Sequence, residues 1–269
     1  MKYNFEAKEV PKRDALIMIQ KYHYSNTLPK LNKHFVGFYL KDKLVGIVTL
    51  GWGTRPLHTI KRIFPSLETK DYYEIGRMCM TEEMPKNSES QMISKLIKWI
   101  KKYEPQIKVL FTWADGIMGK PGYVYQSCSF LYCGFSLTDI YIYNGIKIHP
   151  RQMGYYFRKK NDTRIGIRPT YEEMVENNIE HIRGKQFKYL TFLCSKSEKK
   201  KLLKESLIPL NYDYPKDKDL LWERQVDKGK YETCKKPYYE TDINKSTKEK
   251  VDINSKETQI NIFDFIGSD

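Results

Sequence analysis

The stretch "SESQMISKLIKWIKKYEPQIKVLFTWAD" (residues 88–115) decides the fold. In its first part, residues 88–103, apolar side chains recur at helical spacing and lysines fill the opposite face. This pattern predicts an amphipathic helix with Ser88 as its N-cap. The second part, residues 108–115, is an apolar run that predicts a buried strand ending on Asp115. A helix that leads into a buried strand is typical of a sheet with helices on its faces.

The segments on both sides continue this alternation and give the order β-α-β-β-(α)-β-α-β-α-β. This order predicts an α/β (α+β) fold, with a central mixed sheet flanked by helices, over residues 1–150. Strands are expected at 2–10, 34–40, 43–52, 72–80 and 139–150, and further helices after Pro11, at 59–67 and in the aromatic run before "CGF" (133–135).

The remaining chain is expected to divide into three parts. Residues 151–226 keep an apolar periodicity and predict a small C-terminal extension packed on the core. Residues 227–258 are too polar to bury a core and predict a disordered linker. Residues 259–266 regain apolar character and form a short terminal peptide.

The terminal peptide contains "QINIF" (259–263), which resembles the motif by which bacterial proteins bind the replicative sliding clamp. In this interpretation Gln259, Ile262 and Phe263 enter a preformed groove of the clamp, and the linker acts as a tether. A strand that docks on the protein's own core is the alternative.

Composition narrows the partners and the compartment. The 269 residues carry a formal net charge of +14, which favours a polyanionic partner, most commonly nucleic acid. An AT-rich genome that encodes many lysines is the alternative. No apolar run approaches the roughly 20 residues of a membrane helix, and no signal-peptide core is present, so a cytoplasmic protein is expected. The five cysteines are irregularly spaced, which indicates neither a disulfide framework nor a metal site.

Two charged residues in apolar strands are candidates for chemistry. Arg77 lies inside the strand 72–80, where a guanidinium needs an anionic partner. Glu74 is three positions away and is expected on the opposite face, so the partner is either Asp115 or a bound carboxyl or phosphate group. Asp115 ends its strand, where α/β sheets keep chemistry, and is interpreted as a general base or as an anchor for an amino group. A purely structural pair of Arg77 and Asp115 is the alternative.

The run that follows Asp115 is nearly free of charge and rich in aromatic residues. Trp113, Tyr123 and Tyr125 are expected to form a wall on which an unstacked base could lie, although aromatic residues beside a strand are usually core. The loop 116–122 would be a flexible lip, from which Lys120 could reach a phosphate.

Four short motifs carry a resemblance to a known family. They are "YHYSNTLP" (22–29), "YEIGRM" (73–78), "TWADG" (112–116) and "GYVYQ" (122–126). Over roughly residues 1–160 the chain resembles the Mom family of phage DNA-modification proteins, a divergent branch of the GNAT acyltransferase fold, which "FLYCGF" (130–135) also resembles. The resemblance implies a GNAT-like sheet and a transferase that converts DNA adenine to an N6-carbamoylmethyl form, protecting phage DNA from restriction.

The residues and the resemblance together give the expected site. Expected catalytic residues are His23, Tyr24, Arg77, Asp115 and Tyr125. Expected substrate-binding residues are Ser25, Gly76, Trp113, Lys120, Tyr123 and Gln126. His23 is expected to carry a proton, because the unperturbed pKa of histidine lies near neutrality. Double-stranded DNA is the expected partner.

The donor stays open. Ordinary GNAT proteins cradle the pyrophosphate of acyl-CoA with a glycine-rich loop, whereas this chain has "MPKNSES" (84–90), in which Lys86, Asn87, Ser88 and Ser90 are the candidate donor-binding residues. The donor is therefore either acetyl-CoA-like or an aminoacyl donor such as glycyl-tRNA, with tRNA as a partner. The alternative functions are acylation of a protein or small amine by a GNAT enzyme, and a non-catalytic factor that binds DNA or the clamp.

Overall fold

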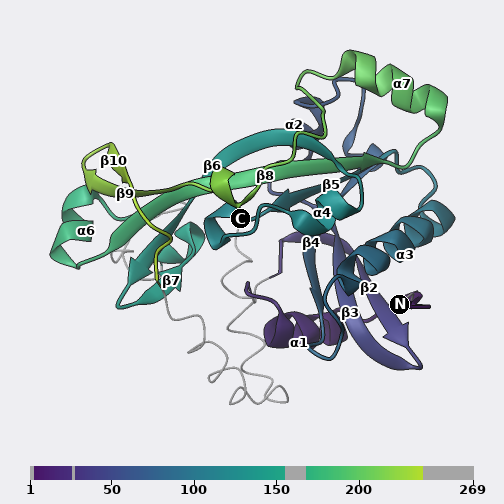
Figure 1. Ribbon diagram of the computed structural model, residues 1–269, viewed down its shortest axis with the longest axis horizontal. Helices are drawn as coiled ribbons and strands as arrows, with labels where there is room; N and C mark the ends of the chain where they lie inside the picture. The colour runs from purple at the N-terminus through teal and green to yellow at the C-terminus, as the bar shows by residue number, and fades with distance from the viewer. Residues whose placement is uncertain (1–2, 26–27, 155–167, 239–269) are drawn as a thin grey trace.

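The computed structural model describes residues 3–25, 28–154 and 168–238, which form one 10-stranded sheet with helices on both faces (Figure 1). The sheet order is β1-β2-β3-β4-β5-β8-β6-β7, with β9 on β8 and β10 on β9. The strands are β1 (Glu6–Glu9), β2 (Leu31–Leu40), β3 (Lys43–Trp52), β4 (Tyr72–Met80), β5 (Val109–Ala114), β6 (Leu131–Tyr143), β7 (Ile146–Ile148), β8 (Glu180–Phe192), β9 (Trp222–Asp227) and β10 (Lys230–Thr233).

The helices connect these strands in the expected alternation. They are α1 (Lys12–Tyr22), α2 (Pro56–Lys61), α3 (Ser88–Tyr103), α4 (Tyr123–Ser127), α6 (Tyr171–Glu176) and α7 (Lys196–Glu205), with 3₁₀ turns η1 (Thr69–Asp71), η2 (Gly116–Met118), η3 (Pro150–Gln152) and η4 (Asp217–Asp219). The β4–β5 pair is parallel and the other pairs are antiparallel, which confirms the expected mixed sheet. No helix in the described ranges is both long enough and apolar enough to cross a membrane.

Alternating side chains show which helices share a face. Leu110 and Phe111 are neighbours on β5 and therefore point to opposite faces. Leu110 packs in the cluster that contains the α3 residues Met92 and Leu96, whereas Phe111 packs with residues of the α2 segment and with Leu202 of α7. Helix α1 packs on Ile47 of β3 and Cys79 of β4, which are paired neighbours. This is the face of the sheet that also carries Phe111, so α1 lies on the same side as α2 and α7.

The boundary expected at residue 150 does not separate two bodies. Strand β8 pairs with β5 on one side and with β6 on the other, so residues 180–192 belong to the central sheet. The expected linker also begins later, because β10 pairs with β9. A sequence pattern cannot reveal this, since antiparallel pairing joins segments at any separation. Residues 239–258 of the expected linker and the whole of 259–266 lie outside the described residues.

A buried carboxylate joins α3 to the sheet. Glu104 follows α3 and accepts hydrogen bonds from the Tyr73 hydroxyl (2.7 Å) and from Lys33 Nζ (3.0 Å). Its Oε1 also lies 2.9 Å from His34 Nε2. Burial alone would raise the pKa of Glu104, but the effect of these hydrogen bonds is larger, and the pKa is lowered to about 2.

We expect this network to make stability depend on pH. Because the pKa of Glu104 is lower in the folded state than in the unfolded chain, its contribution is present above about pH 4.5 and is lost as the pH falls towards about 2. The Glu104→Gln variant should lose about 3 kcal/mol of unfolding free energy at pH 7 and almost none near pH 2. Urea titrations across this range test the expectation, and a difference that does not change with pH would contradict it.

Candidate active site

A bulge in β4 places Glu74 and Arg77 on one face. Thr49 pairs with Arg77 and its neighbour Leu50 pairs with Ile75, so Gly76 is an extra residue in β4. Residues three apart in a regular strand point to opposite faces, but the extra residue reverses this. The expectation that Glu74 and Arg77 face apart is therefore wrong, and the positive charge of Arg77 opposes the rise that burial causes in the pKa of Glu74.

Close packing explains why the bulged residue is glycine. A Cβ atom on Gly76 would lie 2.7 Å from Pro29 Cγ and 2.9 Å from Thr49 Oγ1, which leaves no room for a side chain. The same Thr49 hydroxyl accepts a hydrogen bond from the Arg77 backbone N–H at 2.9 Å. The bulge is thus fixed from both sides, and Gly76 serves the site through its backbone.

The Arg77 guanidinium lies among the other polar groups. It donates to the Gly76 carbonyl oxygen at 2.7 Å and to Ser25 Oγ at 3.1 Å. Burial and the charge of Arg77 together lower the pKa of His23, whereas at Tyr24, Glu74 and Asp115 burial raises the pKa and Arg77 opposes that rise. These four residues come from three separate segments of the chain. The structure therefore brings the motif around Ser25, the centre of β4 and the end of β5 together, as the expected site requires.

Tyr24 and Asp115 form the partly open side of this arrangement. The Tyr24 hydroxyl donates to Asp115 Oδ2 at 3.3 Å, and the tyrosine is 37% exposed. Lys120 Nζ lies 4.3 Å and Lys147 Nζ 5.7 Å from the centre of the Tyr24 ring. Burial raises the pKa of Asp115, while Lys147, Tyr24 and Arg77 oppose this effect. The result is a carboxyl group within a ring of cations, which suits an anionic substrate with a proton to release.

His23 stacks on Tyr24, with ring centroids 4.3 Å apart and planes tilted by 26°. Its Nδ1 lies 2.9 Å from the backbone nitrogen of Ser25. Burial and the charge of Arg77 lower the pKa of His23 to about 3. The imidazole is therefore neutral near pH 7. His23 does not fit the expected role of proton carrier, because only a group that titrates near the working pH exchanges protons readily.

The expected aromatic wall is not formed. Tyr125 is 8% exposed, and its ring packs between Phe130 and Tyr189. Tyr123 is 49% exposed at the start of α4, where Lys216 Nζ lies 5.5 Å from its ring centre. Trp113 packs edge-on against Phe111 on the α2 side. Two residues of one short helix and a residue of the preceding strand face different layers, so no single surface collects them. Of these three aromatic residues, only Tyr125 acts on Tyr24, where it adds to the rise in pKa that burial and Asp115 cause.

Gln126 has a packing role in the structure. Its side-chain nitrogen donates to the Pro215 carbonyl oxygen at 2.8 Å and to the Tyr189 hydroxyl at 3.0 Å. Its Oε1 accepts from Lys216 Nζ at 2.9 Å. The buried amide thus joins α4 to the segment before η4, which leaves it without a free group for a substrate.

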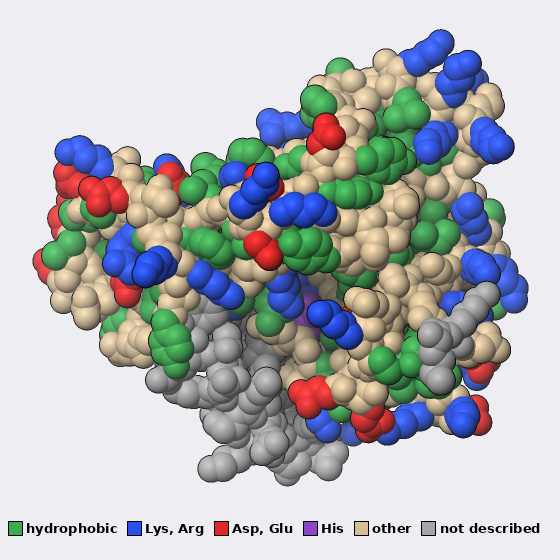
Figure 2. Space-filling model, in the orientation of Figure 1, with side chains coloured by type: hydrophobic (Ala, Val, Ile, Leu, Met, Phe, Trp, Pro, Cys, Tyr) green, Lys and Arg blue, Asp and Glu red, His purple; other side chains and the backbone are tan. Residues whose placement is uncertain are grey.

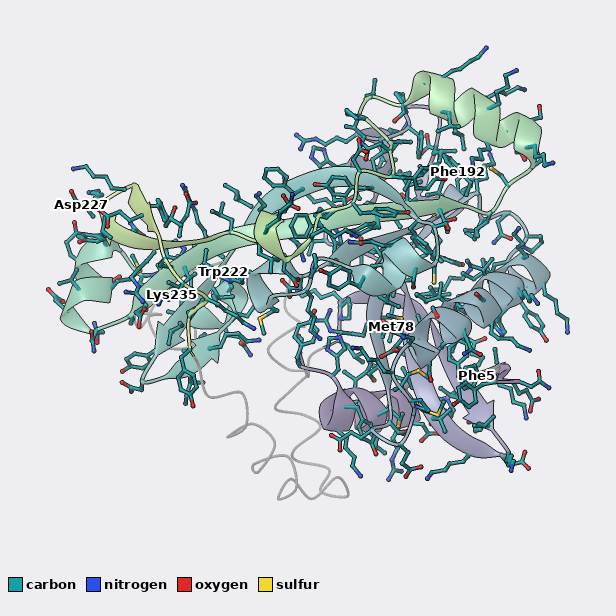
Figure 3. All side chains as sticks on the ribbon, viewed as in Figure 1. Phe5, Met78, Phe192, Trp222, Asp227 and Lys235 are labelled. Atoms are coloured by element: carbon teal, nitrogen blue, oxygen red, sulfur yellow. The ribbon has the colours of Figure 1, made fainter. Side chains whose placement is uncertain are left out.

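The loop 116–122 is packed against β9. The Trp222 indole N–H, on a residue labelled in Figure 3, donates to the Ile117 carbonyl oxygen at 2.8 Å. Ile117 is also buried among Ile140, Ile142 and Ile182. The loop expected as a flexible lip therefore holds Lys120 over Tyr24 in a fixed position.

The start of α3 is where the acyl or aminoacyl donor was expected to bind, but its serine hydroxyls form hydrogen bonds within the turn itself. Ser88 is buried and its hydroxyl donates to the Pro85 carbonyl oxygen at 2.6 Å, while the Ser90 hydroxyl donates to the Asn87 carbonyl oxygen at 2.9 Å. Asn87 has a positive φ of 73° and Lys86 is exposed. The hydroxyls of Ser88 and Ser90 are thus already used within the turn.

Sequence reasoning missed two residues of the site. Glu74 was placed on the wrong face because a bulge has no signal other than its glycine. Lys147 comes from β7 and reaches Tyr24 only through the pairing of β6 with β7, which joins positions remote from residue 24. No group of three or more His, Cys, Asp or Glu residues able to hold a metal occurs in the described part of the chain.

Known proteins are similar to this chain in sequence and in fold. A model of the Mom protein family matches residues 4–216. The methylcarbamoylase mom of Escherichia phage Mu is 27% identical over 186 residues, covering 69% of this chain and 74% of the phage protein. A Bacillus subtilis acetyltransferase in complex with CoA has a TM-score of 0.38 and 13% identity, over 72% of this chain and 100% of that one. The ribosomal-protein-S18-alanine N-acetyltransferase of Escherichia coli has a TM-score of 0.39 and 8% identity, over 71% of this chain and 96% of that one. No activity follows from likenesses at these TM-scores.

Proposed function

The chain belongs to the Mom protein family, and on this premise we propose that it is a transferase that modifies adenine in DNA at N6. The product is of the carbamoylmethyl type, consistent with the methylcarbamoylase of phage Mu to which the chain is similar. Such a modification protects phage DNA from restriction, and the protein acts in the host cytoplasm.

The observation that carries this proposal is the convergence on Arg77. One guanidinium lies among two carboxyl groups and a tyrosine hydroxyl, and Lys120 and Lys147 stand beside them. Adenine N6 is a weak nucleophile, so a carboxylate must accept its proton as the new bond forms. The cations suit the negative charge that develops on the donor carbonyl and the phosphates of the DNA.

The reaction balances with a glycyl ester as donor. N6 attacks the ester carbonyl carbon, the carbon–oxygen bond breaks, and the proton from N6 passes through a carboxylate to the leaving oxygen. The free amine of the attached glycyl group then attacks C6 of the purine and displaces the amide nitrogen. The second step is an isomerisation, which converts N6-glycyladenine into N6-carbamoylmethyladenine without a further reactant. An acetyl-CoA-like donor would stop at an N6-acyl product.

Nucleoside mass spectrometry tests the function. DNA from bacteria that express the full-length chain should contain adenosine with a carbamoylmethyl group, identified by its fragments because the glycyl isomer has the same mass. Cells that express the Arg77→Met variant provide the control. An unmodified adenosine pool with folded protein present would refute the proposal, and tight acetyl-CoA binding in that case would favour acylation of a protein or small amine.

Helix α7 offers a surface for the DNA backbone. Its ten residues include five lysines, and both of its acidic side chains bind serine hydroxyls, Glu198 at Ser195 and Glu205 at Ser66. Figure 2 shows Lys and Arg side chains gathered at the upper right, where Figure 1 places α7. The helix lies on the face of the sheet that carries Glu74 and Phe111. DNA bound on α7 would therefore lie on the same face of the sheet as Glu74.

We expect the salt dependence of binding to locate this surface. Replacing Lys200, Lys201 and Lys204 of α7 with glutamine should reduce the log–log slope of DNA affinity against salt by about 2 to 3, because each lost phosphate contact removes about 0.9. A matched triple replacement of Lys98, Lys101 and Lys102 on α3 should change the slope less, since α3 covers the opposite face. Equal slopes for the two triple variants would show that total charge, not α7, governs binding.

A further inference from the structure

Glu74 is a carboxyl group that the expected site did not include. Trp113 and the backbone N–H of Gly53 hydrogen-bond its carboxyl group. Its Oε2 is buried and has no hydrogen-bond partner among the described residues. A buried carboxyl oxygen without a donor is costly when the group is ionised, so the fold alone gains nothing from this side chain. Its presence is explained better by a role in the chemistry.

The position of Glu74 supports such a role. It pairs with Phe111 near the end of the parallel β4–β5 ladder, which stops at Ile75 and Thr112, and it shares its face with Arg77 through the bulge. Trp113, which holds its carboxyl group, stands two residues before Asp115. The two carboxyl groups therefore flank Arg77, one from β4 and one from the end of β5.

We propose that Glu74 is the proton acceptor of this site and that Asp115, with Tyr24, positions the adenine; this inference rests on the proposed function. As the N6–carbon bond forms, the N6 proton moves to the Glu74 carboxylate. As the bond from carbon to the leaving group breaks, the same proton moves to the leaving atom. Glu74 ends each cycle ionised, and no further reactant is needed.

The electrostatics of Glu74 agree with this geometry. Burial raises the pKa of Glu74 to about 7, although Trp113, Gly53 and the charge of Arg77 each lower it. Burial and, to a smaller extent, the charge of Glu74 raise the pKa of the neighbouring Tyr72. A base whose pKa lies near the working pH can both accept a proton and return it.

The pH dependence of modification tests the assignment. Full-length protein would be incubated with plasmid DNA from about pH 5.5 to about pH 8.5, with glycyl-tRNA and acetyl-CoA as separate donors. The wild-type rate should rise with pH and level off above about pH 7. The Glu74→Gln variant should be about 100-fold slower and lose this rise, whereas Asp115→Asn should be slower but keep it.

Thermal unfolding separates this role from a structural one. Because the pKa of Glu74 is raised from 4.5 to about 7 in the folded state, its ionisation lowers stability as the pH rises from about 4.5 to about 7, and glutamine removes that loss. Glu74→Gln should therefore have a Tm at pH 8 equal to or above that of the wild type. The exposed Glu83→Gln change is the matched control and should alter neither rate nor profile.

The outcomes distinguish the two levels of the proposal. A Glu74→Gln variant within threefold of the wild-type rate, or with an unchanged pH profile, would overturn the role of Glu74 and leave the proposed function standing. A marked fall in its Tm would assign Glu74 to the fold and likewise overturn the inference. Wild-type protein that modifies DNA with neither donor would sink the proposed function and the inference together.

Discussion

Replacing Arg77 with methionine should lower the rate of adenine modification about 10⁴-fold while the fold is retained. Loss of one group that stabilises transition-state charge costs about 10²- to 10³-fold. Arg77 also opposes the rise that burial causes in the pKa of Glu74, so its loss would leave a smaller ionised fraction of this carboxyl group near neutral pH. That second effect contributes roughly another factor of ten.

The measurement is single-turnover formation of the modified nucleoside, with circular dichroism to verify folding. The rate of the Arg77→Lys variant should lie between those of the wild type and of Arg77→Met. An ammonium group keeps the charge but cannot bind both the Gly76 carbonyl oxygen and Ser25 Oγ as the guanidinium does. Arg13→Met on the exposed side of α1 is the matched control. A rate for Arg77→Met within tenfold of the wild type would remove Arg77 from the mechanism.

The Asp115→Asn variant should be about 10³-fold slower than the wild type. Asp115 accepts a hydrogen bond from Tyr24, and its charge offsets that of Lys147 and Lys120. Removing one member of a charged group that is partly buried leaves the others uncompensated, which costs about 4 kcal/mol in comparable cases. Burial also raises the pKa of Asp115, which offsets part of this cost in the Asp115→Asn variant, and circular dichroism verifies that the variant is folded.

Tyr24→Phe provides the comparison for this result. It removes the hydroxyl that donates to Asp115 but keeps the ring that His23 stacks on and that Lys120 covers. It should therefore cost less than Asp115→Asn, about tenfold, which is the usual effect of a single neutral donor. Product yields from the two variants at equal protein and DNA concentrations give the ratio. A Tyr24→Phe defect as large as that of Asp115→Asn would show that the hydroxyl and the carboxylate act as one unit, and would contradict a minor role for the hydroxyl.

Periodicity predicted the parts of the fold that depend on neighbouring residues. The helix expected at 88–103 and the strand expected at 72–80 match α3 and β4, because their burial patterns repeat with the periods of a helix and a strand. The approach of Arg77 to Asp115 followed from two adjacent strands whose ends meet. These features need no knowledge of distant contacts.

The other features depend on contacts that no local pattern carries. One inserted residue at Gly76 reversed the face expected for Glu74, and nothing but a glycine marks that position. The helix expected in the aromatic run is present, but the pattern did not show that it ends after five residues at Ser127 and that β6 starts at Leu131, well before the strand expected at 139–150. The place of β8 in the sheet depends on pairing with distant partners, from Ile142, which is 38 residues before its partner Glu180, to Val109, which is 83 residues before its partner Phe192.

The central position of β8 also governs the order in which this molecule can acquire its structure. During synthesis, β5 and β6 leave the ribosome before residues 180–192. The edges of β5 and β6 that pair with β8 therefore stay unpaired until β8 has been made. Closure of such distant segments is slow, because the entropy of a long loop must be overcome before the pairing stabilises it. The site around Arg77 and Asp115 is thus assembled late. A chain that ends at residue 150 would expose the unpaired edges of β5 and β6, which are prone to aggregate, and would lack the central strand of the sheet.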